Sequence, residues 1–285
     1  MRPLRDTLTL LSRSAPMRRV LRQLVAGERV DDVVRAAAGL AAHGFPVGID
    51  LLAAPARTEA EAFAAVAAYR TLLDRLADAG LAAGTDVAVR PEVLGEPLLD
   101  GARKVCRTAA RVGATVTVEQ PASGDVDATL ALVAALRAEF PDVGVALRAG
   151  EPRTEDDCRA LSATGSRVRL ERGGATDVAE VDRSYVRCLK VLLAGDGYPM
   201  IATHDPRLVE IAAALASRYG RAPSTYEIQM RDGIRVPEQR RLAASGEQVR
   251  VRLAYGAAWH GYLVGRVAER PADLRLFLTS LVSRR

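Results

Sequence analysis

The sequence has few aromatic residues, few lysines and few cysteines. Aromatic side chains make up 4% of its 285 residues, so the core has to be built mainly from alanine, valine and leucine. The only lysines are Lys104 and Lys190, so the pI near 9.4 reflects a general preference for arginine over lysine. Because the sequence has no basic block and no aromatic ladder, its net charge of +5 does not indicate a nucleic-acid partner.

The three cysteines show no metal-binding or disulfide pattern. Cys106, Cys158 and Cys188 lie far apart in segments with helical periodicity, and no CxxC or Cys/His spacing occurs. We expect reduced structural thiols and no metal site. The N-terminus lacks the apolar core of a signal peptide, and no run of about 18 apolar residues occurs. These absences predict a cytoplasmic protein.

Short β-branched runs recur along the chain, each bounded by turn residues and followed by a longer segment rich in alanine and leucine. This pattern predicts eight strands, at Phe45–Leu52, Asp86–Arg90, Ala114–Glu119, Val143–Arg148, Arg167–Glu171, Pro199–His204, Thr225–Met230 and Gln248–Leu253.

Amphipathic helices are predicted between these strands. The clearest is Glu59–Ala79, which Thr58 opens as an N-cap. The same pattern predicts four more helices, at Thr129–Phe140, Thr154–Leu161, Arg207–Tyr219 and Pro237–Ser245. Strand–helix alternation with such long crossovers indicates parallel strands.

Eight such units in this length fit one closed (β/α)8 barrel over residues 1–285, with residues 1–40 as an N-terminal helical extension. An open, doubly wound sheet is the alternative. It is disfavoured because the glycine-rich dinucleotide fingerprint is missing after the first strand.

Polar residues gather at the predicted carboxyl ends of the strands, where barrel enzymes place their chemistry. For any one of them, a structural salt bridge in the barrel mouth is an equally good interpretation. The set comprises Asp50, Arg90, Glu119, Arg148, 169–174, 203–205, 229–232 and 252–256.

Several of these strand ends carry motifs of a known family. The motifs are Arg169-Leu-Glu-Arg-Gly-Gly-Ala175, Ala202-Thr-His-Asp-Pro-Arg207, Tyr226-Glu-Ile-Gln-Met230 and Tyr262-Leu-Val-Gly-Arg-Val-Ala-Glu269. In this order and at matching strands, over roughly residues 20–285, the chain resembles the FAD-dependent proline dehydrogenases of the monofunctional bacterial type. The resemblance implies an FAD-containing oxidoreductase of proline catabolism. It would take a hydride from the carbon beside the ring nitrogen of proline or a proline-like cyclic amino acid, giving the imine.

The resemblance also implies an electron acceptor and site residues. A quinone acceptor would bring the protein into peripheral contact with the inner face of the membrane. The expected cofactor-binding residues are Arg148, Arg169, Gly173, Gly174, Thr203, His204, Gln229 and Glu269. The expected substrate-binding and catalytic residues are Arg90, Arg252, Tyr262 and Arg266.

The substrate side departs from the family pattern. The family's strand-three aspartate is Thr117, a strand-seven leucine is Arg231, and Gly265 replaces the first arginine of the carboxylate-binding pair. One hypothesis is that Arg252, which replaces a tyrosine, takes over from the missing arginine. The alternatives are a flavoenzyme rebuilt for a different or more anionic amine or acid, and a barrel of the same family without catalysis.

Overall fold

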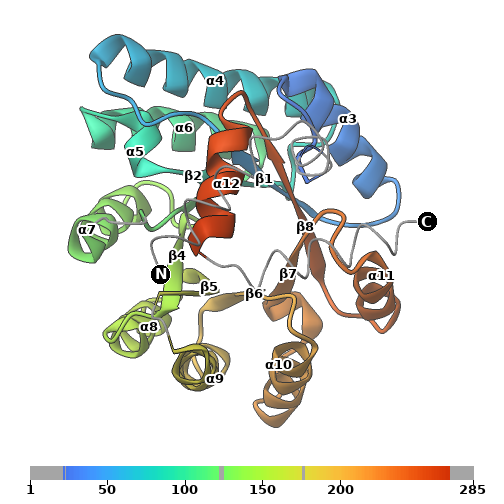
Figure 1. The fold of residues 1–285 in the computed structure, drawn as a ribbon. Coiled ribbons are helices and arrows are strands. Elements are labelled where there is room, and N and C mark those ends of the chain that lie inside the picture. The colour runs from blue at the N-terminus through green and yellow to red at the C-terminus, as the bar shows by residue number, and fades with distance from the viewer. Residues whose placement is uncertain (1–21, 23, 122–124, 175–176, 270–285) are drawn as a thin grey trace.

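The protein is an eight-stranded parallel barrel ringed by helices, as a computed structural model shows (Figure 1). The structure describes residues 22, 24–121, 125–174 and 177–269, with side chains in the last helix described up to residue 264. The strands follow one another in chain order around the barrel, and the last pairs with the first. That closure excludes the open doubly wound sheet and confirms the predicted fold class.

All eight predicted strands are present, with ends that shift by at most three residues. Closure depends on β1 and β8, which pair in parallel from Val47 opposite Val251 to Leu51 opposite Tyr255. The strands are β1 Val47–Leu51, β2 Asp86–Val89, β3 Thr115–Val118, β4 Gly144–Gly150, β5 Arg167–Gly174, β6 Tyr198–Ala202, β7 Glu227–Arg231 and β8 Val249–Tyr255.

The helices cover the outside of the barrel. Thr58 caps the N-terminus of α4 as predicted, because its side chain accepts from the Glu61 amide while the Glu61 carboxylate reaches back to the Thr58 amide. The helices are α3 Val30–Ala41, α4 Glu59–Asp78, α5 Pro91–Leu94, α6 Leu98–Val112, α7 Val126–Arg137, α8 Thr154–Ala163, α9 Val178–Ala194, α10 Pro206–Arg218, α11 Val236–Ala244 and α12 Trp259–Glu269. A short 3-10 turn, η1 Pro223–Thr225, precedes β7.

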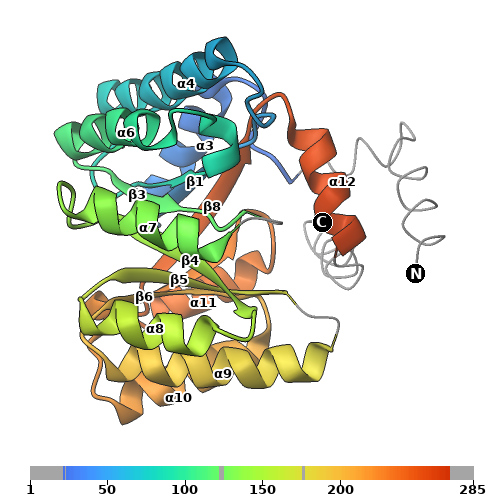
Figure 2. The ribbon, with the colours of Figure 1, turned by 90° about the vertical axis from the view of Figure 1, so that its left-hand side faces the viewer.

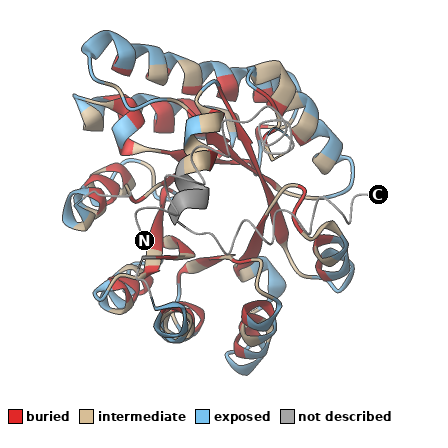
Figure 3. Ribbon diagram, in the orientation of Figure 1, coloured by how far each residue is buried: buried red, intermediate tan, exposed pale blue. Residues whose placement is uncertain are grey.

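The main hydrophobic core lies between the strands and the helices. Outward-facing strand residues such as Ile49, Val87 and Val168 are fully buried against apolar helix faces (Figure 3). The three cysteines are free and buried in α6, α8 and α9, as expected from their helical surroundings. Among the described helices, none is both long and apolar enough to cross a membrane.

The inside of the barrel is charged, in contrast to the apolar outer core. Successive strand residues point to opposite faces, so every second residue points inward. Near the amino ends of the strands, Arg250 pairs with Glu227 through two contacts of 2.7 and 2.8 Å and donates to the carbonyl oxygens of Val47 and Gly84. Ion pairs therefore occupy part of the barrel interior, which branched apolar residues fill in many barrels.

Candidate active site at the barrel mouth

Helix α12 stands over the mouth, on the side where the strands end (Figures 1 and 2). The chain enters it through Gly256, whose φ of 129° and whose approach to the Leu52 carbonyl leave no room for a side chain. The start of the helix is fixed by Trp259, which is buried and donates from Nε1 to the Glu28 carboxylate at 2.9 Å. The amide of Ala26 donates to the Ala254 carbonyl at 2.8 Å, so the segment before α3 lies along the end of β8.

Arg252 is the centre of an ion-pair network inside the mouth. Its guanidinium contacts the carboxylate of Asp50, that of Glu119 at 3.0 Å and that of Glu171 at 3.3 Å. The side chain is 7% exposed. Burial opposes its charge, but these three carboxylates outweigh burial and raise the pKa of Arg252 well above its ordinary value. The side chain is therefore already saturated with internal partners.

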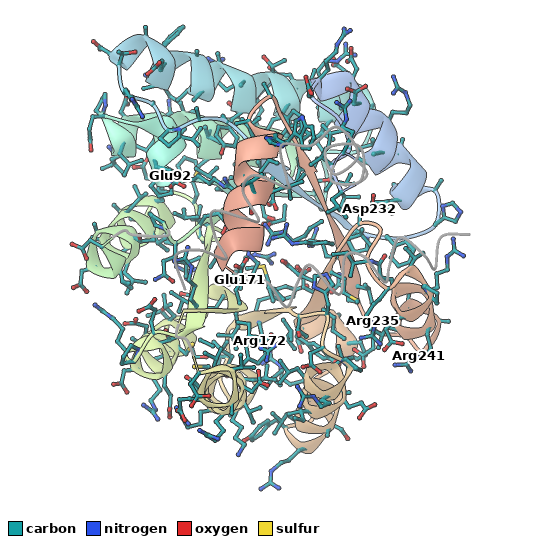
Figure 4. All side chains as sticks on the ribbon, viewed as in Figure 1. Glu92, Glu171, Arg172, Asp232, Arg235 and Arg241 are labelled. Carbon is teal, nitrogen blue, oxygen red and sulfur yellow. The ribbon has the colours of Figure 1, made fainter. Side chains whose placement is uncertain are left out.

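Arg169 lies fully buried beside this network. It contacts Glu119, lies 3.4 Å from Glu171 through Nε and lies 3.8 Å from Asp86 through Nη1. Neither Nε nor Nη1 has a hydrogen-bond acceptor among the described residues. Figure 4 shows Glu171 toward the barrel axis, whereas its neighbour Arg172 belongs to the outer side and pairs with Asp182.

Thr117, which stands where the family has an aspartate, faces the same interior. Its hydroxyl lies 2.9 Å from both carboxylate oxygens of Asp86, one strand away. Burial tends to raise the pKa of Asp86, but Arg250, Arg169 and Arg167 outweigh burial and lower it. The interior therefore keeps a carboxylate near this level, supplied from β2 instead of β3.

Arg90 and Tyr262, two of the expected substrate residues, are brought together. The Arg90 guanidinium lies 4.2 Å from the centre of the Tyr262 ring, and Tyr262 lies on α12. Within the described part of the chain, no carboxylate lies within 4.0 Å of the Arg90 guanidinium. Burial tends to lower the pKa of Arg90, but the nearby Tyr262, Glu119 and Asp50 outweigh burial and raise it.

His204, an expected cofactor residue, joins the ends of β6 and β7. Its Nε2 accepts a hydrogen bond of 2.9 Å from the Arg231 amide, and its carbonyl accepts from Arg235 at 2.7 Å. Burial first, and then the charges of Arg231, Arg235 and Arg252, lower the pKa of His204 to about 3. The ring is therefore neutral near pH 7 with its proton on Nδ1, because Nε2 is the acceptor.

The other expected cofactor residues surround the same space at different depths. Thr203 is buried, and its hydroxyl oxygen accepts from the Asp205 amide at 3.1 Å. Arg148 donates to the Gln120 carbonyl at 2.8 Å. Gly173 is buried near the end of β5, and Gly174 pairs with Gly150 after an irregularity in β4.

Gln229 lies deeper than the mouth, inside the barrel. Its amide nitrogen donates to Glu227 at 2.6 Å, and its buried Oε1 has no partner among the described residues. The side chains of Arg266 and Glu269 lie outside the described residues, so their roles stay predictions.

The sequence analysis assigned no role to Asp50, Glu119 or Glu171, although all three are in the predicted set of strand ends. The structure makes them the partners of Arg169 and Arg252. A usable signal was present in β5, where the alternation of Arg167, Arg169 and Glu171 puts charged residues on one face of a strand. Which carboxylate meets which arginine depends on neighbouring strands, and the alternation within one strand does not contain that information.

Comparison with known proteins gives one consistent result. The family model described as proline dehydrogenase matches residues 175–274. Proline dehydrogenase of Deinococcus radiodurans is 30% identical over 276 residues, covering 88% of this chain and 86% of that protein. Proline dehydrogenase 1 of Bacillus subtilis is 25% identical over 291 residues, covering 98% and 96% of the two chains.

Among solved structures, proline utilization A from Bdellovibrio bacteriovorus, inactivated by N-propargylglycine, superposes with a TM-score of 0.82 at 20% identity. The match covers 90% of this chain, which spans about a third of that longer protein (33%). At this identity the superposition supports the barrel fold.

Proposed function

The chain belongs to the proline dehydrogenase family, and on that premise we propose that FAD is its cofactor and a proline-like cyclic amino acid its substrate. It is an oxidoreductase of the proline dehydrogenase type, acting on CH–NH bonds. In the proposed reaction a hydride leaves the carbon beside the ring nitrogen, the nitrogen loses a proton, and the product is the cyclic imine.

The observation that carries the proposal is the set of hydrogen-bond donors at the mouth that lack internal acceptors. Arg169 is fully buried, yet its Nε and Nη1 find no hydrogen-bond acceptor among the described residues. His204 has a neutral ring whose Nδ1–H is oriented by the bond at Nε2. Buried donors usually have partners, so these atoms suit a bound group rich in acceptors. The carbonyl and ring-nitrogen edge of an isoalloxazine is such a group.

In this proposal FAD, when bound, supplies the two-electron acceptor that the protein side chains lack. Arg169 and His204 would hold the ring, with Thr203 beside them. Gly173 would allow the backbone to approach it, because a glycine has no side chain to intervene. Glu119 and Glu171 partly neutralise the positive charge of Arg169. We therefore expect the surroundings of the isoalloxazine ring to be less cationic than a lone arginine would make them.

On the substrate side, Arg90 is the best supported carboxylate-binding residue. It has no carboxylate partner among the described residues, and Tyr262 holds its guanidinium plane against α12. The contacts of Arg252 argue against the hypothesis that it replaces the missing arginine of the family pair, because three carboxylates already occupy it. We assign Arg252 a positioning role, in which it holds Asp50, Glu119 and Glu171 in place.

Two absorbance measurements test the proposal. The purified protein is expected to show flavin absorption bands, and anaerobic addition of proline should bleach them because the ring is reduced. A colourless protein that takes up no added FAD would contradict the cofactor assignment. A yellow protein that proline does not bleach would support the alternative, a flavoenzyme for another amine or acid. The charged side chains inside the mouth are an observation in favour of that alternative substrate.

The electron acceptor and location form a separate part of the proposal. We propose a quinone acceptor reached by peripheral contact with the inner face of the membrane, with the protein in the cytoplasm. The family resemblance is the support for this part. Turnover with proline and a water-soluble quinone, compared with turnover with oxygen, tests it, and equal rates with both would count against a dedicated quinone reaction.

A further inference from the structure

Arg231 lies at the mouth without an ion-pair partner in the part of the chain that the structure describes. It ends β7, where Glu227 and Gln229 face the barrel interior, so the alternation of the strand directs Arg231 inward as well. Its side chain is half-buried. Among the described residues, no carboxylate lies within 4.0 Å of its guanidinium, and the one hydrogen bond it makes is from its backbone amide to His204.

Among the described residues, Asp50 is a carboxylate that feels the charge of Arg231, and it is already held by Arg252. Arg235 and Arg252 are also close enough to act on the His204 ring together with Arg231. The carboxylates of Asp50, Glu119 and Glu171 are held by Arg252, and two of them by Arg169 as well. A half-buried cation among other cations is unfavourable unless an anion joins it.

Arg90 supplies a second cation on the opposite flank of the same strands, and it too has no carboxylate partner among the described residues. In the closed barrel β8 and β1 separate β7, which carries Arg231, from β2, which leads into Arg90. Asp50, on β1, lies between the two arginines and feels the charge of Arg231, while Arg90 feels the charge of Asp50. The mouth therefore carries two guanidinium groups, at the end of β7 and just after β2, that have no carboxylate within 4.0 Å among the described residues.

We propose that Arg231 binds a second acidic group of the substrate, so that the preferred substrate is a cyclic amine bearing two carboxylates or a carboxylate and another anionic substituent. Arg90 takes the carboxylate beside the reacting carbon, and Arg231 takes the other. This inference rests on the proposed function, because it assigns the substrate class of that same site.

Binding of two unreactive ring acids tests the inference without relying on turnover. The probes are tetrahydrofuran-2-carboxylate and cis-tetrahydrofuran-2,5-dicarboxylate, in which oxygen replaces the ring nitrogen so that no imine can form. Isothermal titration on the flavin-loaded protein is expected to show the diacid binding at least about tenfold more tightly than the monoacid, because it adds one charge-assisted hydrogen-bonded pair.

The variants separate a specific contact from a general effect of charge. In Arg231→Leu the preference for the diacid should disappear, and in Arg231→Lys most of it should remain, because the charge is kept. Arg240→Leu is the matched control: Arg240 is exposed on α11, and its loss removes the same charge from the same strand–helix unit. It should keep the full preference. Unfolding temperatures of all variants verify that each one folds.

Three results would overturn the inference. One is equal binding of the monoacid and the diacid by the unmodified protein. Another is an undiminished diacid preference in Arg231→Leu. A loss of bound flavin in Arg231→Leu would also overturn it, because Arg231 would then serve a phosphate of the cofactor and not the substrate. Flavin bleaching by proline is a separate readout: its failure would support the alternative, a flavoenzyme for another amine or acid, while a diacid preference stays measurable by binding.

Discussion

Replacing Arg252 with leucine tests whether this residue is the centre of a structural network or a ligand-binding group. The substitution leaves Asp50 nearly buried, with a side chain 4% exposed, and takes one partner from Glu119 and Glu171. Breaking a buried ion pair from one side typically costs about 3–5 kcal/mol of folding free energy. At roughly 2–4 °C per kcal/mol, the unfolding temperature should fall by roughly 6–20 °C.

The pH dependence of the same variant gives a second measure. In the unmodified protein, Arg252, Arg169 and Arg231 together outweigh burial and lower the pKa of Asp50. A lowered pKa contributes stability that is present above about pH 4 and is lost as the pH falls further. Without Arg252, burial dominates and should raise this pKa, so ionisation of Asp50 opposes folding. The deficit of Arg252→Leu should therefore be larger at about pH 8 than at about pH 5.

Thermal and urea unfolding of a small set of variants decides the question. Adding Asp50→Asn to Arg252→Leu should recover part of the loss, because it removes the unpaired carboxylate. Arg207→Leu is the control, since Arg207 also meets two carboxylates but its side chain is 70% exposed, and it should leave the unfolding temperature almost unchanged. If Arg252→Leu keeps its stability and instead loses affinity for tetrahydrofuran-2-carboxylate, our interpretation is wrong and Arg252 binds the substrate.

Three further predictions concern the barrel interior and its mouth. Arg250→Met should destabilise the protein by about 3–5 kcal/mol in urea unfolding, with partial recovery when Glu227→Gln is added; no recovery would mean that the pair is not coupled. Because the pKa of His204 is lowered to about 3, stability should fall as the pH drops below about 6.5, by up to about 2 kcal/mol near pH 5. His204→Gln, which can still accept from the Arg231 amide, should flatten that part of the profile, and an unchanged slope would refute the assignment. Gly256→Ala should cost about 1–3 kcal/mol and shift the fluorescence of the buried tryptophan at the start of α12, whereas Gly261→Ala, with open space around it, should be neutral or stabilising.

The strands could be predicted from the sequence because each is a short apolar run bounded by turn residues. The predicted ends of the helices and strands were less accurate. Helix α7 begins at Val126 and not at Thr129, because the Asp125 side chain caps the helix by accepting a hydrogen bond from the Asp127 amide. A capping aspartate four residues before the predicted start is a local signal that hydrophobic periodicity alone does not contain.

The chemistry of the mouth was only partly predictable. The motif around Arg169 and the pair Thr203–His204 could be located because they lie in β5 and directly after β6, two neighbouring strands of the closed barrel. The role of Arg252 could not be predicted, since a lone arginine in place of a tyrosine suggests a ligand contact. Its three carboxylate partners come from β1, the end of β3 and β5, so the saturation of its charge is a property of the closed barrel.

The hydrogen bonds between residues 26–28 and residues 254–259 have a consequence for the order in which the protein folds. The segment before α3 leaves the ribosome early, but its partners in β8 and α12 are among the last described residues to be synthesised. All eight strands are therefore synthesised before α12 is anchored over their carboxyl ends. We expect a large ligand to reach the ends of the strands more easily before residues 26–28 pair with residues 254–259 than after these contacts have formed.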